Sequence, residues 1–204
     1  MLSAHDRFQR GVLIDHHMAH AFEAREIGFW WYLLSDAIIF ALLFVTYGVM
    51  VDRTAGGPDA AALVDLNRAF IETLCLLASS FTFALADLAA EGNDRPRTVA
   101  WLAVTTVLGG AFLCIEGLEF IELVLAGAGP DRSGFLSAFF TLVGTHGLHV
   151  SVGMIGLLAL LAQIRVFGLS RPVKSRLRRL GLFWHFLDVL WVGVFTFVYL
   201  AGSL

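Results

Sequence analysis

Long stretches of apolar residues dominate the chain, and short polar segments separate them. Five of these stretches reach about 20 residues, the length of helix that crosses a hydrocarbon core of roughly 30 Å. Strands of a membrane barrel would instead alternate polar and apolar residues over about ten positions. The pattern therefore predicts an all-α integral membrane bundle of five transmembrane helices, at about Ile27–Val51, Ala69–Ala90, Val99–Ala126, Phe135–Ile164 and Leu180–Ala201.

Composition supports this class of protein. The chain has 204 residues, of which 58% are hydrophobic and 15% charged, and its mean hydropathy is +0.77, above the range of soluble domains. We expect residues 1–26 to form a polar tail and residues 27–204 the transmembrane domain. The tail has no apolar region of its own, so we do not expect it to be a signal peptide. The net charge of −3 argues against a nucleic-acid partner.

Basic residues predict the orientation in the membrane. The N-terminal tail and the second and fourth loops contain 11 of the 14 Lys and Arg residues, and the opposite loops contain Arg53, Arg68 and Arg132. Cytoplasmic loops are enriched in Lys and Arg. The N-terminus is therefore predicted to be cytoplasmic and the C-terminus outside.

Ionisable residues inside the predicted spans are the candidates for function. A charged residue at the centre of a span costs about 2.5–3.5 kcal/mol on insertion scales, so such residues normally face the interior of the bundle. The three glutamates of the third span follow each other at i, i+3 and i+6, on one broad helix face. The candidates are Asp36, Glu72, Glu116, Glu119, Glu122, His146, His149, His185 and Asp188.

Three interpretations of these residues compete. Carboxylates and histidines from neighbouring helices could bind two iron ions or a zinc ion. Di-iron bundles, however, have a His three residues after a Glu, and no Glu in this sequence is followed by a His at that spacing. The residues could also form a proton or ion path, as in a transporter. Many transporters are built from two repeated halves, and the sequence shows no such repeat. Hydrogen bonding between helices is favoured, because Ala138 and Gly153 share the helix face of His146 and His149 and allow close packing.

An aromatic cluster lies near the predicted cytoplasmic end of the first span. Trp30, Trp31 and Tyr32 are consecutive there, and Trp and Tyr are enriched at membrane–water interfaces. We expect these residues to belong to an interfacial belt, with direct lipid contacts as the alternative.

Five collinear motifs carry a resemblance to a known family. From about Gly28 to the C-terminus, the sequence resembles subunit III of the haem–copper terminal oxidases. Two loop segments, TAGGP and GPDRSGFLSAFF, are most similar to the cytochrome bo-type ubiquinol oxidases. Subunit III of a cytochrome c oxidase is the alternative, and a free-standing membrane metalloenzyme or ion transporter is a remote one. The motifs are GFWWYLLSDAIIFALLFVTY, ETLCLLASS, EGLEFIEL, GPDRSGFLSAFFTLVGTHGLHVSVG and WHFLDVLWVGVFTFVYL.

The resemblance implies a non-catalytic subunit of a proton-pumping complex that oxidises ubiquinol and reduces oxygen to water. It implies that this chain has no redox centre, since the haems and copper belong to subunit I, and that subunit III supports assembly, stability and sustained turnover. Subunit I is the implied direct partner, with subunit II, a small subunit IV and membrane lipids, including a bound phospholipid. The implied location is the bacterial inner membrane.

The histidine count gives an independent argument about the redox centres. Two haems and a copper need roughly six histidine ligands. The predicted spans contain only His146, His149 and His185, which are too few for such a centre.

The resemblance also assigns a role to one pair of residues, and the hydrogen-bonding interpretation assigns roles to the histidines. The pair Ser35-Asp36 matches a family Ser-Glu pair whose carboxyl group reacts with carbodiimides, and the shorter Asp places that carboxyl group differently. Within the bundle, we expect His146 and His149 to hydrogen-bond to Glu116 or Glu119. His185 and Asp188 are expected to form a parallel seam.

Overall fold

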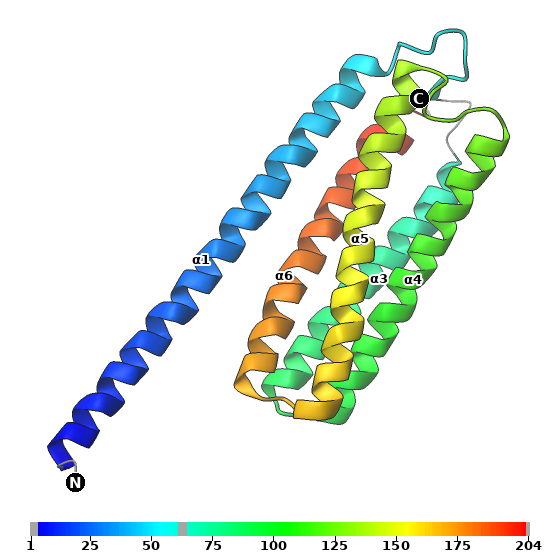
Figure 1. Cartoon of the computed structure of the whole chain (residues 1–204). Coiled ribbons are helices and arrows are strands. Elements are labelled where there is room, and N and C mark those ends of the chain that lie inside the picture. Colours follow the sequence, from blue (N-terminus) through cyan, green and yellow to red (C-terminus); the bar gives the residue numbers. More distant parts are fainter. Residues whose placement is uncertain (1–3, 61–64, 203–204) are drawn as a thin grey trace. The chain divides into compact units, whose positions relative to one another are not determined.

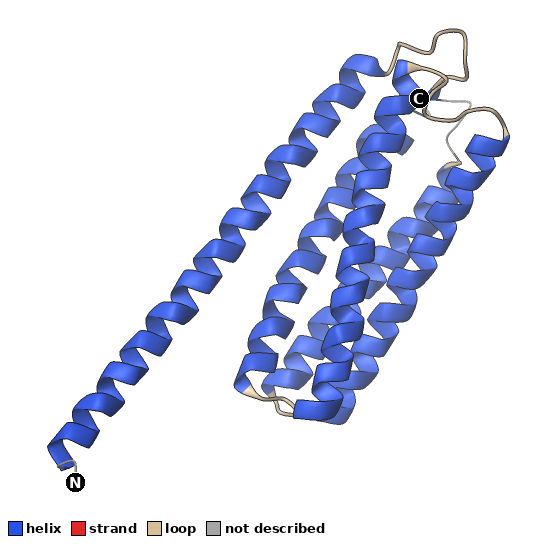
Figure 2. Cartoon of the chain, in the orientation of Figure 1, coloured by secondary structure: helices blue, strands red, loops and turns tan. Residues whose placement is uncertain are grey.

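The computed structural model describes residues 4–60 and 65–202, with side chains from residue 27 onward. No strand occurs in these two ranges (Figure 2). Five of the helices are long and apolar enough to cross a membrane, so the predicted all-α class is confirmed. The elements are α1 (Ala4–Met50), α3 (Leu66–Glu91), α4 (Arg95–Leu125), α5 (Gly134–Phe167), α6 (Arg171–Val194) and the π-helix η1 (Phe195–Leu200).

The helices extend beyond the apolar stretches. The first continues back through a polar segment to Ala4, and α6 begins at Arg171 instead of near Leu180. Hydropathy indicates where a bilayer could surround a helix, whereas the helix itself ends where capping groups satisfy its terminal backbone. In α6, a proline in the first turn and a run of good helix formers, Arg and Lys, extend the helix past its apolar part.

Side-chain caps and one glycine fix the ends of the other helices. The Asp65 carboxylate accepts hydrogen bonds from the first turn of α3, and Asp94 does the same for α4. The Ser133 hydroxyl accepts from the backbone N–H of Leu136 at the start of α5. Gly168, with φ of +63°, follows the end of α5 in a conformation that favours glycine.

The chain divides into two compact units at a point within α1. The first comprises Met1–Ile39 and the second Phe40–Leu204. In the first unit, the Ser35 hydroxyl donates to the carbonyl oxygen of Tyr32. The side chains of residues 1–26, predicted to be a polar tail, lie outside the described residues.

Four helices of the second unit form a closed ring. α3 packs against α4 and α6, and α5 packs against the same two helices. Short connections join α3 to α4 and α5 to α6, so that neighbours in sequence run antiparallel (Figure 1). The centre of the ring is filled by large apolar side chains, among them Phe83, Leu102, Phe112, Leu142, Leu157 and Trp191.

Trp184 of α6 sets the spacing of this ring. Its indole N–H donates to the Ser79 hydroxyl of α3 over 3.0 Å. On its other sides, the ring lies against Gly109 of α4 and Gly153 of α5, where an added methyl group would come within 2.9 Å of the indole. Small residues of this kind let helix backbones approach closely in membranes. One side chain therefore contacts the other three helices.

We predict that Gly109→Ala lowers the free energy of unfolding by about 1–3 kcal/mol, because the new methyl group overpacks a buried site whose neighbour is a large fixed ring. Gly117→Ala is the matched control on the same helix, since nothing lies within 4 Å of the added group. Thermal unfolding of the two variants in detergent measures the difference. Equal midpoints would show that Trp184 does not constrain the spacing.

Candidate functional site

Three buried glutamates of neighbouring helices lie together in the second unit. Glu72 of α3 is 0% exposed, and Glu116 and Glu119 of α4 are each 4% exposed. Glu116 and Glu119 are three residues apart, and so project from the same face of α4. The three carboxyl groups are near enough to interact electrostatically with one another. We call them the carboxyl cluster.

Tyr199 completes this cluster. It lies in η1, is fully buried, and its hydroxyl interacts electrostatically with Glu72, Glu116 and Glu119. The π-helical turn brings Val198 and Tyr199 into the interior together, and π-helical turns are frequent at functional sites. The sequence analysis missed Tyr199, because a tyrosine at the end of a span is typical of an interfacial belt.

Aromatic rings bound the cluster toward the middle of the bundle. Phe112 lies one helical turn before Glu116, and its ring meets the Trp191 ring edge to face, with centroids 4.7 Å apart. The Trp191 indole N–H donates to the Thr73 hydroxyl of α3 over 3.1 Å. Trp191 therefore joins α6 to α3 directly beside Glu72.

An ion pair lies at the other side of the cluster, toward the connection between α4 and α5. Arg68 of α3 donates to a carboxylate oxygen of Glu122 over 2.7 Å, with side-chain exposures of 28% and 60%. Glu122 was predicted to share a face with Glu116 and Glu119, but it lies at the rim and is paired. An exposed ion pair of this kind contributes about 0–1 kcal/mol to the free energy of unfolding. It therefore stabilises the fold little, and it lies at the exposed edge of the cluster.

His146 does not hydrogen-bond to Glu116 or Glu119, so that prediction is wrong. Its ring is fully buried, and neither ring nitrogen has a hydrogen-bond partner among the described residues. It packs against Phe40, Phe112 and Trp191, with ring centroids 5.1 Å apart in the last case. The physical reason is the level of His146 along the bundle: at that level its neighbours are aromatic rings, where carboxyl groups were expected.

His149 bonds within its own helix. Its Nδ1 donates to the carbonyl oxygen of Thr145 over 2.7 Å, and its ring meets Phe40 with centroids 5.3 Å apart. His149 was predicted to hydrogen-bond to Glu116 or Glu119, and for this residue that stays a prediction. The hydrogen bond to the preceding turn of α5 fixes the tautomer and the orientation of the ring.

His185 makes a polar contact between α6 and α3, which we call the His185 seam; the predicted seam of His185 with Asp188 stays a prediction. Its Nδ1 lies 2.6 Å from the Ser80 hydroxyl, and its ring packs against Phe83. Asp188 and Asp87 are near enough to interact electrostatically with His185. This seam and the carboxyl cluster are separate groups of polar residues on the same pair of helices.

Metal binding was weighed as one interpretation of these residues. Among the described side chains, those of residues 27–60 and 65–202, no group of three or more His, Cys, Asp or Glu residues is arranged to hold a metal ion. The carboxyl groups of the cluster are near one another without converging on one point.

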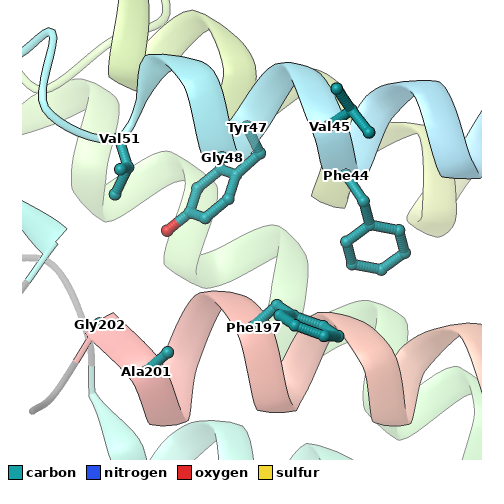
Figure 3. A pocket seen from close by; sticks show the side chains of 8 residues that line it. All are labelled: Phe44, Val45, Tyr47, Gly48, Val51, Phe197, Ala201 and Gly202. Carbon is teal, nitrogen blue, oxygen red and sulfur yellow. The ribbon is translucent and has the colours of Figure 1, made fainter.

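An apolar groove lies between the end of α1 and η1. It has a volume of about 470 Å³, and its lining includes Phe44 and Gly48 on one side and Phe197 and Ala201 on the other (Figure 3). The Phe44 and Phe197 rings are 5.9 Å apart. The shape and apolar lining suit a hydrocarbon chain. Trp30, Trp31 and Tyr32, predicted to belong to an interfacial belt with lipid contacts as the alternative, are exposed on α1.

Comparison with known proteins identifies relatives along the whole chain. Residues 2–203 match the family described as cytochrome c oxidase subunit III. The chain is 49% identical over 191 residues to the cytochrome bo(3) ubiquinol oxidase subunit 3 of Pseudomonas aeruginosa, covering 93% of this chain and 91% of that protein. It is 39% identical to the quinol oxidase subunit 3 of Bacillus spizizenii, covering 86% of each chain. It is 40% identical to the cytochrome c oxidase subunit 3 of Bacillus sp. strain PS3, covering 86% and 85%.

We predict that Ser80→Ala lowers the free energy of unfolding by about 1–3 kcal/mol, because it removes the partner of a half-buried His185 nitrogen. Ser151→Ala is the control: it also removes a hydroxyl group, but one that bonds only to the Gly147 carbonyl of its own helix. The control should change stability by about 0.5 kcal/mol or less. Thermal unfolding in detergent compares the two, and equal losses would contradict a bond between α3 and α6.

Proposed function

We propose a function from the premise that the chain belongs to the cytochrome c oxidase subunit III family. In this proposal, the chain is the non-catalytic subunit III of a proton-pumping quinol oxidase. One observation carries this proposal. The 49% identity to a cytochrome bo(3) ubiquinol oxidase subunit extends over nine-tenths of both chains. The alternative is subunit III of a cytochrome c oxidase. It has weaker support, because the cytochrome c oxidase relative from Bacillus is only 40% identical.

In this role the complex oxidises ubiquinol and reduces oxygen to water in aerobic respiration, and the chemistry belongs to partner subunits. Subunit I holds the haems and copper and packs directly against this chain, and subunit II and a small subunit IV complete the complex. This chain supports the assembly, stability and sustained turnover of subunit I. The interlocked ring of four helices, with Trp184 at its centre, suits a rigid support.

The proposed setting is the bacterial inner membrane. Residues 27–204 form the membrane domain, and residues 1–26 form a cytoplasmic tail. The C-terminus then lies outside, since the described chain has five helices able to span the bilayer. On this orientation, the carboxyl cluster lies in the outer half of the membrane and the His185 seam lies deeper.

Lipid is the proposed non-protein ligand of this subunit. The groove between Phe44 and Phe197 accommodates an acyl chain, and the exposed rings of Trp30, Trp31 and Tyr32 suit the level of the head groups. We assign His146, His149, His185 and Asp188 to the packing of the bundle. No catalytic or metal-binding role is proposed for any residue of this chain.

The proposal predicts that haem and copper purify with the tagged chain only together with larger partner subunits. A mild-detergent pull-down from native membranes, a reduced-minus-oxidised optical spectrum and a metal analysis test this. The same chain expressed alone is the control and should be free of haem and metal. Stoichiometric metal in the lone chain would instead indicate a free-standing metalloenzyme, and partners without haem would indicate a transporter.

A separate prediction concerns Asp36, which we propose contributes to sustained turnover. Asp36→Asn preserves the size of the side chain but removes its ability to ionise. We expect normal assembly with reduced sustained oxygen consumption, or an altered dependence of that rate on pH. Oxygen uptake by the purified complex over a range of pH is the measurement. An unchanged profile would assign Asp36 a structural role alone.

A further inference from the structure

The carboxyl cluster contains buried polar atoms that the described residues leave without hydrogen bonds. Both carboxyl oxygens of Glu72 and of Glu116 lack a partner, as does Oε2 of Glu119. The Tyr199 hydroxyl, also fully buried, has none either. Buried polar groups in proteins are nearly always satisfied by the chain or by ordered water. Such a concentration in one place therefore points to something bound there.

The spacing of the groups identifies what can fill the gaps. The carboxyl groups interact electrostatically with one another and with Tyr199, and the Tyr199 hydroxyl lies near the Glu119 carboxyl group. Both oxygens of Glu72 and of Glu116 nevertheless make no hydrogen bond to a described residue. Nor do they converge as metal ligands do among the described residues. Polar groups separated by slightly more than a hydrogen bond are typically bridged by water.

The surrounding charges decide the ionisation of the cluster. Three carboxylates buried together would repel one another, and each would also lose its hydration. Arg68 is the one base in the set of titratable and charged groups near the cluster, and its guanidinium is already bonded to Glu122. His146 lies behind the Phe112 and Trp191 rings. The other members of this set are Asp65 and Cys75 on α3, Glu122 on α4, Tyr199 on η1 and Tyr47 on α1.

We propose that Glu72, Glu116, Glu119 and Tyr199 form a hydrated proton-binding site, in which water molecules bridge carboxyl groups that hold their protons at neutral pH. Tyr199 donates its hydroxyl proton into this network. Protons and water exchange with the surface past Glu122, which lies at the exposed rim one turn beyond Glu119. The ligands are water molecules and the protons that the carboxyl groups carry, and the site is distinct from the His185 seam.

Infrared difference spectroscopy of the complex purified from its native membranes tests this proposal. The spectrum of the wild type minus that of Glu116→Gln at neutral pH should contain the carbonyl stretching band of one protonated carboxylic acid. Exchange into D₂O should shift that band, because water reaches the site. Glu72→Gln and Glu119→Gln should behave alike. Glu122→Gln is the matched control on α4 and should remove only carboxylate bands, because Glu122 is ion-paired.

Tyr199→Phe gives a second readout that does not require the loss of a carboxyl group. Removal of the hydroxyl should shift the carboxylic acid band to higher frequency without abolishing it, since one hydrogen bond to the cluster is lost. This variant decides the question if a glutamine variant fails to assemble.

Two results would overturn the proposal. Loss of only carboxylate bands in the cluster variants would show ionised groups, balanced by a bound cation instead of protons. A carboxylic acid band that does not shift in D₂O would show a site closed to water. Neither result depends on whether the complex is a quinol oxidase, so the failure of this inference and the failure of the proposed function are distinguishable.

Discussion

Two indole rings on α6 hold the four-helix ring together. Trp184 and Trp191 each donate a buried N–H to a hydroxyl group of α3, on Ser79 and Thr73, and a buried indole usually finds such a partner. Without a hydrophobic driving force between helices in lipid, close packing and hydrogen bonds between helices determine the association. The glycines of α4 and α5 beside Trp184 supply the close packing.

The carboxyl cluster depends on the same constraint. Trp191 lies between the cluster and the middle of the bundle, since its ring packs on Phe112 and its N–H bonds to Thr73. Beyond that level, Glu72 and Glu116 lie buried on adjacent helices, alongside the buried Phe139 ring. The bundle thus holds together carboxyl groups whose oxygens lack hydrogen-bond partners among the described residues.

The polar residues of the spans therefore serve two physical purposes. The His185 and Ser80 pair is satisfied directly and joins two helices, which suits the supporting role proposed above. The carboxyl cluster is satisfied through bound water and protons in our proposal. A support for a proton-pumping enzyme and a site that holds protons are compatible in one chain, because the two groups occupy different levels of the same helices.

The sequence by itself determined the number of spanning helices, because each needs about 20 apolar residues to cross a bilayer, and it determined the family through five collinear motifs. It also identified Glu72, Glu116, Glu119 and His185 as candidates, because polar residues are rare in spans. Only the tertiary structure decided which of them meet. The rotation and depth of each helix depend on contacts such as Trp184 with Gly153, which hydrophobic periodicity does not encode. For that reason His146 lies among aromatic rings, Glu122 lies at the rim, and a π-helical turn brings Tyr199 to the carboxyl cluster.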